Sequence, residues 1–387
     1  MVIVGGGIGG LASALACAQA GRAVRLIEQA PDFGEVGAGI QLGPNVTRIL
    51  QSWGQGDALK GVAAFPVRLE VRHALTAQTM GVMPLGSRMQ RLYGAPYATV
   101  ARADLHALLL KAVQALPVTL QLSTALEAVA QKPDAVTLKT RDGDVQTSPL
   151  LIGADGLWGQ VRQHLLPLVS PRATGHLAYR AMVRQRDLPA LVRSQVVTAW
   201  MGPRFHVVQY PVRGGEWLNV VAIVHGSVNG DPTLWDHVAN ATELRARLAS
   251  TQAPLLDLIH AIDDWRLWPL YDRPPMAGPQ EHAQGRIALL GDAAHPMRPY
   301  LAQGAGMAIE DAQQLAASLA LHPQQVPAAL AHYAQARWQR NARVQARAIR
   351  NGEIFHLRGP MRLGRDWSLR LLGTRLLDVP WLYGYQL

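Results

Sequence analysis

Residues 1–28 read MVIVGGGIGGLASALACAQAGRAVRLIE, and this stretch decides the fold. A short apolar strand at residues 1–4 runs directly into a glycine-rich turn. Residues 11–20 are uncharged and rich in alanine, which favours a helix, and residues 24–27 form a second apolar strand. This order of strand, glycine turn, helix and strand predicts a βαβ unit that binds a dinucleotide.

Each glycine of the GxGxxG motif has its own physical task. Gly5 permits the tight turn, Gly7 lets a pyrophosphate approach the backbone, and Gly10 lets the helix pack closely on the strand. The phosphates then meet the free N–H groups and the positive dipole end of the helix. Glu28, eighteen residues after Gly10, can accept hydrogen bonds from the adenosine ribose hydroxyls. The alternative, a secretory signal peptide, lacks the basic segment that such peptides need.

Composition narrows the class of protein. Of the 387 residues, 49% are hydrophobic and 17% are charged, which is typical of a globular enzyme. The net charge of +10 favours anionic partners: a dinucleotide, a carboxylate substrate, nucleic acid or an acidic membrane surface. The single cysteine, Cys17, excludes an intrachain disulfide and a cysteine-based metal site. We expect a cytoplasmic protein.

The C-terminal region carries a regular series of arginines. Their spacing of three and four residues predicts one helical face. We expect this face to be solvated and to pair with acidic groups elsewhere; its members are Arg337, Arg340, Arg343, Arg347 and Arg350.

Stretches that read as alternating helix and strand are separated by stretches that read as β-rich. This pattern predicts an α/β fold assembled from separated segments. One Rossmann-type domain is expected from residues 1–72, 98–172 and 273–325. An inserted antiparallel β-sheet substrate domain is expected from residues 73–97 and 173–272, and a helical region from residues 326–387.

Two further motifs repeat the pattern of an apolar strand that ends on an acid. Residues 150–156 read LLIGADG and residues 287–296 read IALLGDAAHP. Asp155 and Asp292 can therefore accept hydrogen bonds from sugar or ribityl hydroxyls. A helix expected to begin at Gly304-Ala305-Gly306 offers backbone N–H groups to the N1–C2=O edge of a flavin.

With these three motifs in order, the chain resembles the class A FAD-dependent aromatic hydroxylases, which have the p-hydroxybenzoate hydroxylase fold. Arg102 matches the arginine at a helix start that contacts FAD in this class. The chain is most similar to the branch of 3-hydroxybenzoate 6-hydroxylase, 6-hydroxynicotinate 3-monooxygenase and salicylate hydroxylase. The stretches that support this branch are residues 34–45, 202–219 and 381–385.

The resemblance implies non-covalent FAD, NADH or NADPH as a transient co-substrate, O₂, and hydroxylation of a small aromatic carboxylate through a flavin C4a-hydroperoxide. His206 and Tyr210 match a pocket-lining pair, in which the histidine takes the phenolic proton. Pro299 matches the proline placed over the flavin, and Arg298 is a candidate anchor for the substrate carboxylate. Arg298-Pro299 replaces the Leu-Gln expected for 3-hydroxybenzoate, which leaves a hydroxynicotinate substrate equally open.

Three alternatives remain at this stage. A flavoprotein epoxidase or a quinone-pathway hydroxylase at a membrane would use the basic, amphipathic residues 361–377 to contact anionic lipid weakly. A nucleic-acid-binding protein with a vestigial cofactor site is the non-enzymatic reading, and we expect no nucleic acid partner. We also expect no metal site, although His295 lies close to Asp292, and the sequence leaves a homodimer open.

Overall fold

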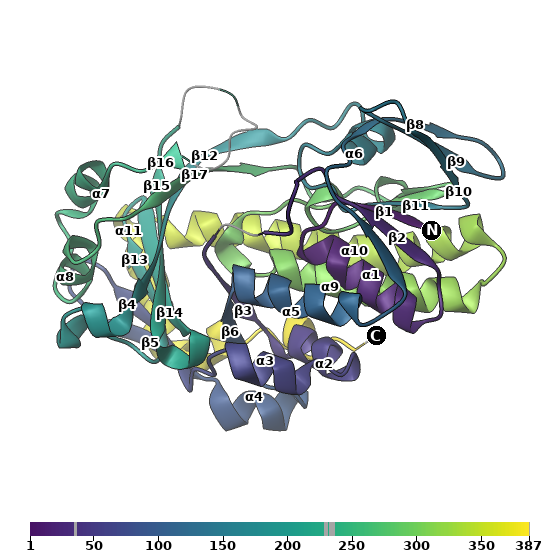
Figure 1. The fold of residues 1–387 in the computed structure, drawn as a ribbon. Coiled ribbons are helices and arrows are strands. Elements are labelled where there is room, and N and C mark those ends of the chain that lie inside the picture. The colour runs from purple at the N-terminus through teal and green to yellow at the C-terminus, as the bar shows by residue number, and fades with distance from the viewer. Residues whose placement is uncertain (35–36, 228–230, 232–236, 387) are drawn as a thin grey trace.

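The computed structural model describes residues 1–34, 37–227, 231 and 237–386, and its two large sheets lie at opposite ends of the molecule (Figure 1). The six-stranded sheet has the order β18-β19-β11-β1-β2-β7. All its strands are parallel except β18. The strands are β1 (Val2–Val4), β2 (Val24–Ile27), β7 (Val118–Gln121), β11 (Leu151–Gly153), β18 (Ala283–Gln284) and β19 (Ile287–Leu289).

Helices cover this sheet and enclose the largest apolar core. Their apolar side chains, among them Leu11, Leu105 and Ile309, are buried in one cluster, and Cys17 is buried and free. The helices are α1 (Ile8–Gln19), α2 (Pro44–Ser52), α3 (Gly56–Val62), α5 (Arg102–Gln114) and α9 (Gly304–Leu321). The predicted Rossmann-type α/β architecture is confirmed.

The second sheet has eight strands in the order β16-β17-β12-β15-β14-β13-β4-β5. Neighbours are antiparallel except β13 and β4, so the predicted meander is present in β13, β14 and β15. One face packs against α7 (Ala241–Leu248) and α8 (Leu255–His260). The strands are β4 (Arg68–His73), β5 (Thr79–Pro84), β12 (Arg172–Arg184), β13 (Val197–Gly202), β14 (Phe205–Val212), β15 (Trp217–His225), β16 (His237–Val238) and β17 (Arg266–Asp272).

Smaller elements complete the two ends. A two-stranded ribbon pairs β3 (Gly39–Leu42) with β6 (Ala98–Ala101), beside α4 (Gly86–Tyr93). A three-stranded antiparallel sheet holds β8 (Leu126–Gln131), β9 (Val136–Thr140) and β10 (Val145–Ser148), with α6 (Gln160–Leu165) packed on β8. Two 3₁₀ helices, η5 (Gly291–Ala293) and η6 (Pro299–Leu301), follow β19.

The C-terminal region is helical, with α10 (Val326–Phe355), α11 (Gly359–Leu372), α12 (Thr374–Leu377) and α13 (Pro380–Tyr383). The long helix α10 contacts β18 and β19, and the residue after it contacts β14, so α10 connects the two large sheets (Figure 1). None of the described helices combines the length and apolarity needed to span a bilayer.

The arginine series of α10 pairs with acidic groups, as the sequence predicted, but it is solvated only in part, because Arg343 and Arg350 are exposed and Arg337 is not. Arg337 is fully buried and pairs with Glu310 and Asp311 of α9 at 2.8 and 2.7 Å. Arg340 also pairs with Glu310, at 2.6 Å. The reason is that α10 packs along α9, which presents these two buried acids to it. Arg337 and Arg340 therefore hold the two helices together, whereas Arg343 and Arg350 face solvent.

Candidate active site

A cavity of about 810 Å³ opens at the carboxyl ends of the parallel strands β1, β2, β11 and β19. This is the edge at which open α/β sheets bind ligands. Eight of the predicted cofactor residues line it: Gly5, Gly7, Glu28, Arg102, Asp155, Asp292, Gly304 and Ala305. The other two, Gly10 and Gly306, lie behind its wall.

The glycines that do not line the cavity have packing roles. A Cβ atom on Gly10 would lie 1.8 Å from the carbonyl oxygen of Gly5, which itself has φ +106°. A Cβ atom on Gly306 would lie 2.9 Å from the Val46 side chain. The turn and the helix start can therefore keep this shape only with glycine at these positions.

Asp155 supplies the clearest sign that the cavity holds a ligand with hydroxyl groups. Its Oδ2 atom accepts a hydrogen bond from the backbone N–H of Val161 at 2.7 Å. Its Oδ1 atom is buried and has no hydrogen-bond partner among the described residues. Burial raises the pKa of Asp155 to about 6. A buried acceptor without a donor is unfavourable, so a hydroxyl donor in the cavity would satisfy it.

The remaining polar groups fit the other parts of a dinucleotide. The Glu28 carboxylate is held at the glycine turn by the backbone N–H groups of Gly6 and Ala30, at 2.6 and 2.8 Å. Gly7 precedes the first residue of α1, and α9 begins at Gly304, so two helix N-termini point into one cavity. Asp292 is exposed on η5 beside them. The residues present thus fit FAD, with donors for phosphates and acceptors for hydroxyls.

The predicted catalytic residues His206, Tyr210 and Pro299 lie outside the lining of this cavity. His206 and Tyr210 share one face of β14, because they are four residues apart on a strand. Tyr210 lies opposite Asn219 of β15, and Arg180 of β12 lies opposite Val221, two residues further along the same face. The sheet therefore gathers His206, Tyr210, Asn219 and Arg180 on the face turned away from α7 and α8.

Arg180 lies on this face, although it was not among the residues predicted for the site. Its guanidinium stacks on Trp268 at 3.9 Å, and Trp268 lines the cavity. Its Nε atom is buried without a hydrogen-bond partner in the described part of the chain, and burial lowers its pKa to about 10. Alternation along β12 was the available signal, because Tyr179 packs in the core of the opposite face.

Arg298, the predicted anchor for a carboxylate, already has an acidic partner. Its Nε atom donates to Asp272 Oδ2 at 2.7 Å, and Asp272 is 1% exposed. The other oxygen of Asp272 accepts a hydrogen bond from Arg172 at 2.6 Å. Arg298 is thus held in a network of charged side chains, whereas Arg180 has no acidic partner among the described residues. The structure therefore favours Arg180 over Arg298 as the anchor.

His206 is buried in a cluster of rings. Its Nδ1 atom lies 2.9 Å from Nε2 of His356, and its ring lies edge-on to Tyr300 and Phe355. Burial, together with the nearby His176, lowers the pKa of His206 to about 3, so the imidazole is neutral at pH 7. Burial raises the pKa of Tyr210, which keeps its hydroxyl protonated. A neutral base and a hydroxyl donor thus stand on the same face.

His295 belongs to a buried ion-pair network at the α9–α10 contact. Its Nε2 atom lies 2.5 Å from Asp311 Oδ2, and Arg337 Nε donates to the other oxygen of Asp311 at 2.7 Å. Burial acts to raise the pKa of Asp311, but His295 and Arg337 outweigh it and lower the pKa. Both oxygens of the carboxylate are therefore already taken by cationic or donor groups.

Comparison with known proteins agrees with this geometry. The family described as "FAD binding domain" matches residues 1–348. The chain belongs to this family. The matched residues include the glycine motif, both strand-end acids and the start of α9.

Two relatives and one solved structure define the likeness further. A 3-hydroxybenzoate 6-hydroxylase of Polaromonas naphthalenivorans is 35% identical over 389 residues, covering 100% of this chain and 96% of that protein. A 6-hydroxynicotinate 3-monooxygenase of Bordetella bronchiseptica is 38% identical over 81% of each chain. A salicylate hydroxylase in complex with its substrate superimposes with a TM-score of 0.84 at 28% identity, covering 100% of this chain and 95% of that one.

These matches confirm the predicted family, its FAD cofactor and its class of enzyme, the single-component flavoprotein aromatic hydroxylases. The roles of individual residues are not settled by likeness and depend on the geometry of this chain.

Proposed function

We propose that this protein hydroxylates a small aromatic ring that carries a carboxylate and a hydroxyl group, with NAD(P)H and O₂ as co-substrates. The observation that carries the proposal is the face of the eight-stranded sheet that gathers Arg180, Asn219, Tyr210 and His206. The chemistry that FAD supplies when bound is hydride uptake from NAD(P)H and activation of O₂.

Arg180 binds the substrate carboxylate in this proposal. Its buried Nε atom and the buried Nδ2 atom of Asn219 both lack a hydrogen-bond partner among the described residues. Two donors of this kind on one sheet face are suited to an anion, and an arginine–carboxylate pair is a strong, directional contact. Stacking on Trp268 fixes the plane of the guanidinium.

His206 and Tyr210 act on the phenolic end of the ring. Removal of the phenolic proton makes the ring more nucleophilic, which the reaction with an electrophilic oxygen requires. His206 is neutral and accepts this proton when the phenolate that forms beside it offsets the effect of burial, and Tyr210 orients the same oxygen through a hydrogen bond. Pro299, the first residue of η6, would cover the flavin on its O₂-reactive side, next to Tyr300, whose ring lies 5.1 Å from that of His206.

A panel of aromatic acids tests the proposal. Purified holoenzyme is mixed with NADH or NADPH and hydroxybenzoates, salicylate or hydroxynicotinates, and each is paired with the same phenol lacking its carboxylate. We expect one acid to accelerate NAD(P)H oxidation and to give a hydroxylated product in equal amount. Preference for the ring without a carboxylate would contradict the proposal and favour the epoxidase or quinone-pathway alternative.

The proposed base is tested separately with His206→Ala. This variant should retain FAD and its reduction by NAD(P)H, whereas hydroxylation should fall by roughly 10²–10⁴, the usual contribution of a general base. Hydrogen peroxide should rise, and the deficit should shrink at a pH that ionises the phenol unaided. Tyr210→Phe should act in the same direction, but less. Full hydroxylation by His206→Ala at neutral pH would remove His206 from the mechanism.

We also propose a weak contact between α11 and an anionic lipid surface. Leu363, Trp367 and Leu371 form one stripe of this helix and are 54%, 61% and 75% exposed, and Arg370 and Arg375 are exposed close by. Co-sedimentation with anionic vesicles, lost at high salt and in Trp367→Ser, supports it. Salt-insensitive self-association of the chain would instead show that a second copy covers this stripe.

A further inference from the structure

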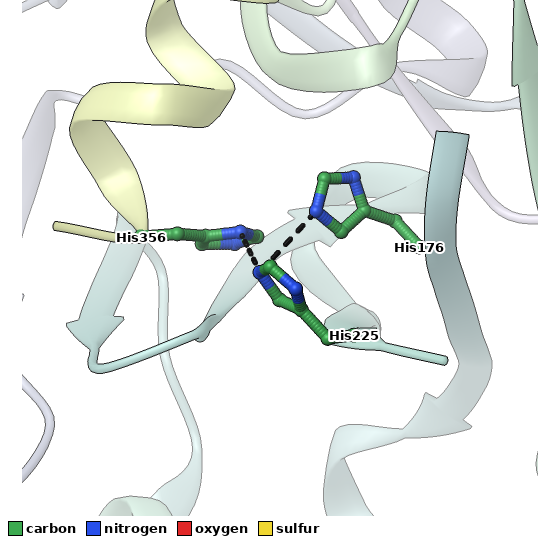
Figure 2. A group of neighbouring side chains, drawn as sticks. All are labelled: His176, His225 and His356. Carbon is green, nitrogen blue, oxygen red and sulfur yellow. Dashed lines mark hydrogen bonds between the residues drawn. The ribbon is translucent and has the colours of Figure 1, made fainter. Parts of the chain in front are cut away.

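Three histidines from distant parts of the chain converge at the end of the eight-stranded sheet. Figure 2 shows His176 of β12, His225 at the end of β15 and His356 after α10 with their rings turned toward one another. His225 Nε2 lies 3.3 Å from His176 Nε2 and 3.1 Å from His356 Nδ1. One nitrogen of each ring lies within 4.8 Å of the other two.

The two separations from His225 Nε2 match the edge of a metal coordination shell. Ligand nitrogens at the zinc–nitrogen distance of about 2.0–2.1 Å stand about 3.3 Å apart in a tetrahedron. Burial, the largest cause, lowers the pKa of all three rings, and the neutral imidazole is the form that binds a metal. The three ligand atoms and their protonation thus suit a divalent transition metal.

In two of the rings, the nitrogen that points away from the centre of the cluster has a hydrogen-bond partner, as is usual for histidines that bind a metal. His176 Nδ1 lies 2.9 Å from the hydroxyl of Tyr300, and His356 Nε2 lies 2.9 Å from His206 Nδ1. Such contacts fix the ring orientation and the tautomer of a ligand. The site is therefore supported around its rim as well as at its centre.

The charged side chains near the three histidines are compatible with a bound cation that carries an anionic ligand. Arg298 and Arg365 are paired with Asp272 and Asp366, both at 2.7 Å. Arg204 and Arg358 act on His225 electrostatically and would favour hydroxide or another anion at a fourth ligand position. In contrast, the second group of candidate ligands, His282, His295 and Asp311, includes a carboxylate that already pairs with the buried guanidinium of Arg337. That fixed cation leaves it no need for a metal.

We propose that His176, His225 and His356 bind one divalent transition metal ion, with Zn²⁺ the best fit, and leave a fourth position for water or an anion. Three neutral imidazoles in a tetrahedral arrangement suit Zn²⁺ better than the hard cations Mg²⁺ and Ca²⁺, which prefer oxygen ligands. The inference departs from the expectation of no metal site, because sequence separation hid a cluster whose members are 49 and 131 residues apart.

Metal binding would change the tautomer of His206. Without the metal, one arrangement of the protons has His206 Nδ1–H donating to His356 Nε2, which leaves His206 Nε2 free to accept a proton. With the metal, His356 Nδ1 is a ligand, its Nε2–H donates to His206 Nδ1, and the proton of His206 moves to Nε2. Since Nε2 is then occupied, His206 cannot accept the phenolic proton. This consequence, inhibition of hydroxylation by Zn²⁺, rests on the proposed role of His206.

Metal binding is tested first by spectroscopy that does not depend on activity. Chelator-treated holoenzyme is titrated with Co²⁺, and the visible bands of tetrahedral Co²⁺ are followed at wavelengths beyond the flavin absorption. We expect saturation at one ion per chain and displacement by Zn²⁺. His225→Ala should lower Zn²⁺ affinity at least about tenfold, the scale on which loss of even a supporting contact acts. His164→Ala, which removes an exposed histidine of α6, should bind like the unchanged chain.

Two results would overturn the metal site. One is the absence of tetrahedral Co²⁺ bands in the unchanged holoenzyme, which would leave the three rings as a hydrogen-bonded network alone. The other is equal Zn²⁺ uptake by His225→Ala and His164→Ala, with flavin absorbance showing that both are folded. Inhibition of hydroxylation by Zn²⁺ is measured separately from Zn²⁺ binding. If Zn²⁺ binds at His225 but hydroxylation continues, the metal site stands and the proposed role of His206 fails.

Discussion

At the scale of single residues, the cofactor cavity is defined by what its side chains lack. Asp155 keeps one buried oxygen without a donor, although its other oxygen caps the start of α6. Folding has thus desolvated an acceptor that a ligand hydroxyl in the cavity can satisfy, and burial raises its pKa. A residue with this mixture of satisfied and unsatisfied atoms marks a site more specifically than its place in a motif does.

Asp292 should contribute directly to the affinity for FAD. Its carboxylate lines the cavity on η5, where it can accept hydrogen bonds from the ribityl chain. Asp292→Ala should weaken binding by about 1–3 kcal/mol, the range for a hydrogen bond to a charged group. Titration of the apoprotein with FAD measures this, with Asp257→Ala on the exposed side of α8 as the control. Equal affinity of the two variants would place Asp292 outside the site.

Arg180 should control substrate affinity without affecting the cofactor. Arg180→Gln removes the proposed partner of the carboxylate, so kcat/KM should fall by roughly 10- to 150-fold, corresponding to about 1.5–3 kcal/mol. FAD occupancy should not change. Arg184→Gln is the matched control, because Arg184 lies on the same strand and its guanidinium stacks on Trp217 at 5.1 Å. Steady-state kinetics on the best aromatic acid decide between them.

At the scale of elements, α10 illustrates how charge can hold a helix in place. Its arginines have the spacing of a surface face, but α9 offers two buried acids at the contact, and Arg337 is drawn into the interior between them. Arg340 follows with a bidentate contact to Glu310. The helix therefore depends on a buried network in which every member needs its partners.

Removal of one member of this network should be strongly destabilising. Arg337→Leu leaves Glu310 and Asp311 buried with less compensation, which typically costs about 3–5 kcal/mol. Arg350→Leu alters an exposed arginine of the same helix and should change stability by less than about 0.5 kcal/mol. Urea unfolding of the three proteins at neutral pH measures the difference. Similar midpoints for both variants would show that the network contributes little.

At the scale of the whole molecule, two sheets with different periodicities meet along α10. The parallel sheet binds the dinucleotide at its strand ends, and the antiparallel sheet turns one face toward it (Figure 1). His356, next to the end of α10, contacts β14, and η6 places Tyr300 against the same histidines. Elements that are distant in sequence thus bring the end of α10 and η6 against the histidines of the antiparallel sheet.

Stability of the whole molecule should decrease in mild acid, because His282 is buried in its neutral form. Burial lowers the pKa of His282 to about 3, with Nδ1–H donating to Leu289 and Nε2 accepting from Asn341. Below pH 6.5 the unfolded chain binds a proton that the folded chain does not, so stability falls as the pH falls from about 6.5 toward 3. The slope for this residue is at most about 1.4 kcal/mol per pH unit.

Urea unfolding at neutral pH and near pH 5 checks this, with His282→Asn beside the unchanged chain. The variant should be less stable at neutral pH but should lose less stability in acid. His260→Asn, an exposed histidine of α8, should retain the full pH dependence. A parallel decline of all three proteins would show that other groups govern the acid response.

The amino-acid sequence by itself determined the local features. Strand, glycine turn and helix at residues 1–28 depend on short-range order, so the βαβ unit and the start of α9 could be predicted, although α1 begins at Ile8, three residues before the stretch expected to be helical. The acids at the strand ends followed from the same logic, and the family likeness extended it along the chain.

Only the tertiary structure decided what distant segments do together. Strand pairing placed Arg180 beside Tyr210, helix packing buried Arg337, and the junction of β12, β15 and α10 gathered His176, His225 and His356. None of these contacts has a local signature, because burial and charge depend on the surfaces that fold against a residue. Sequence periodicity tells which face a side chain is on, and only packing tells what that face meets.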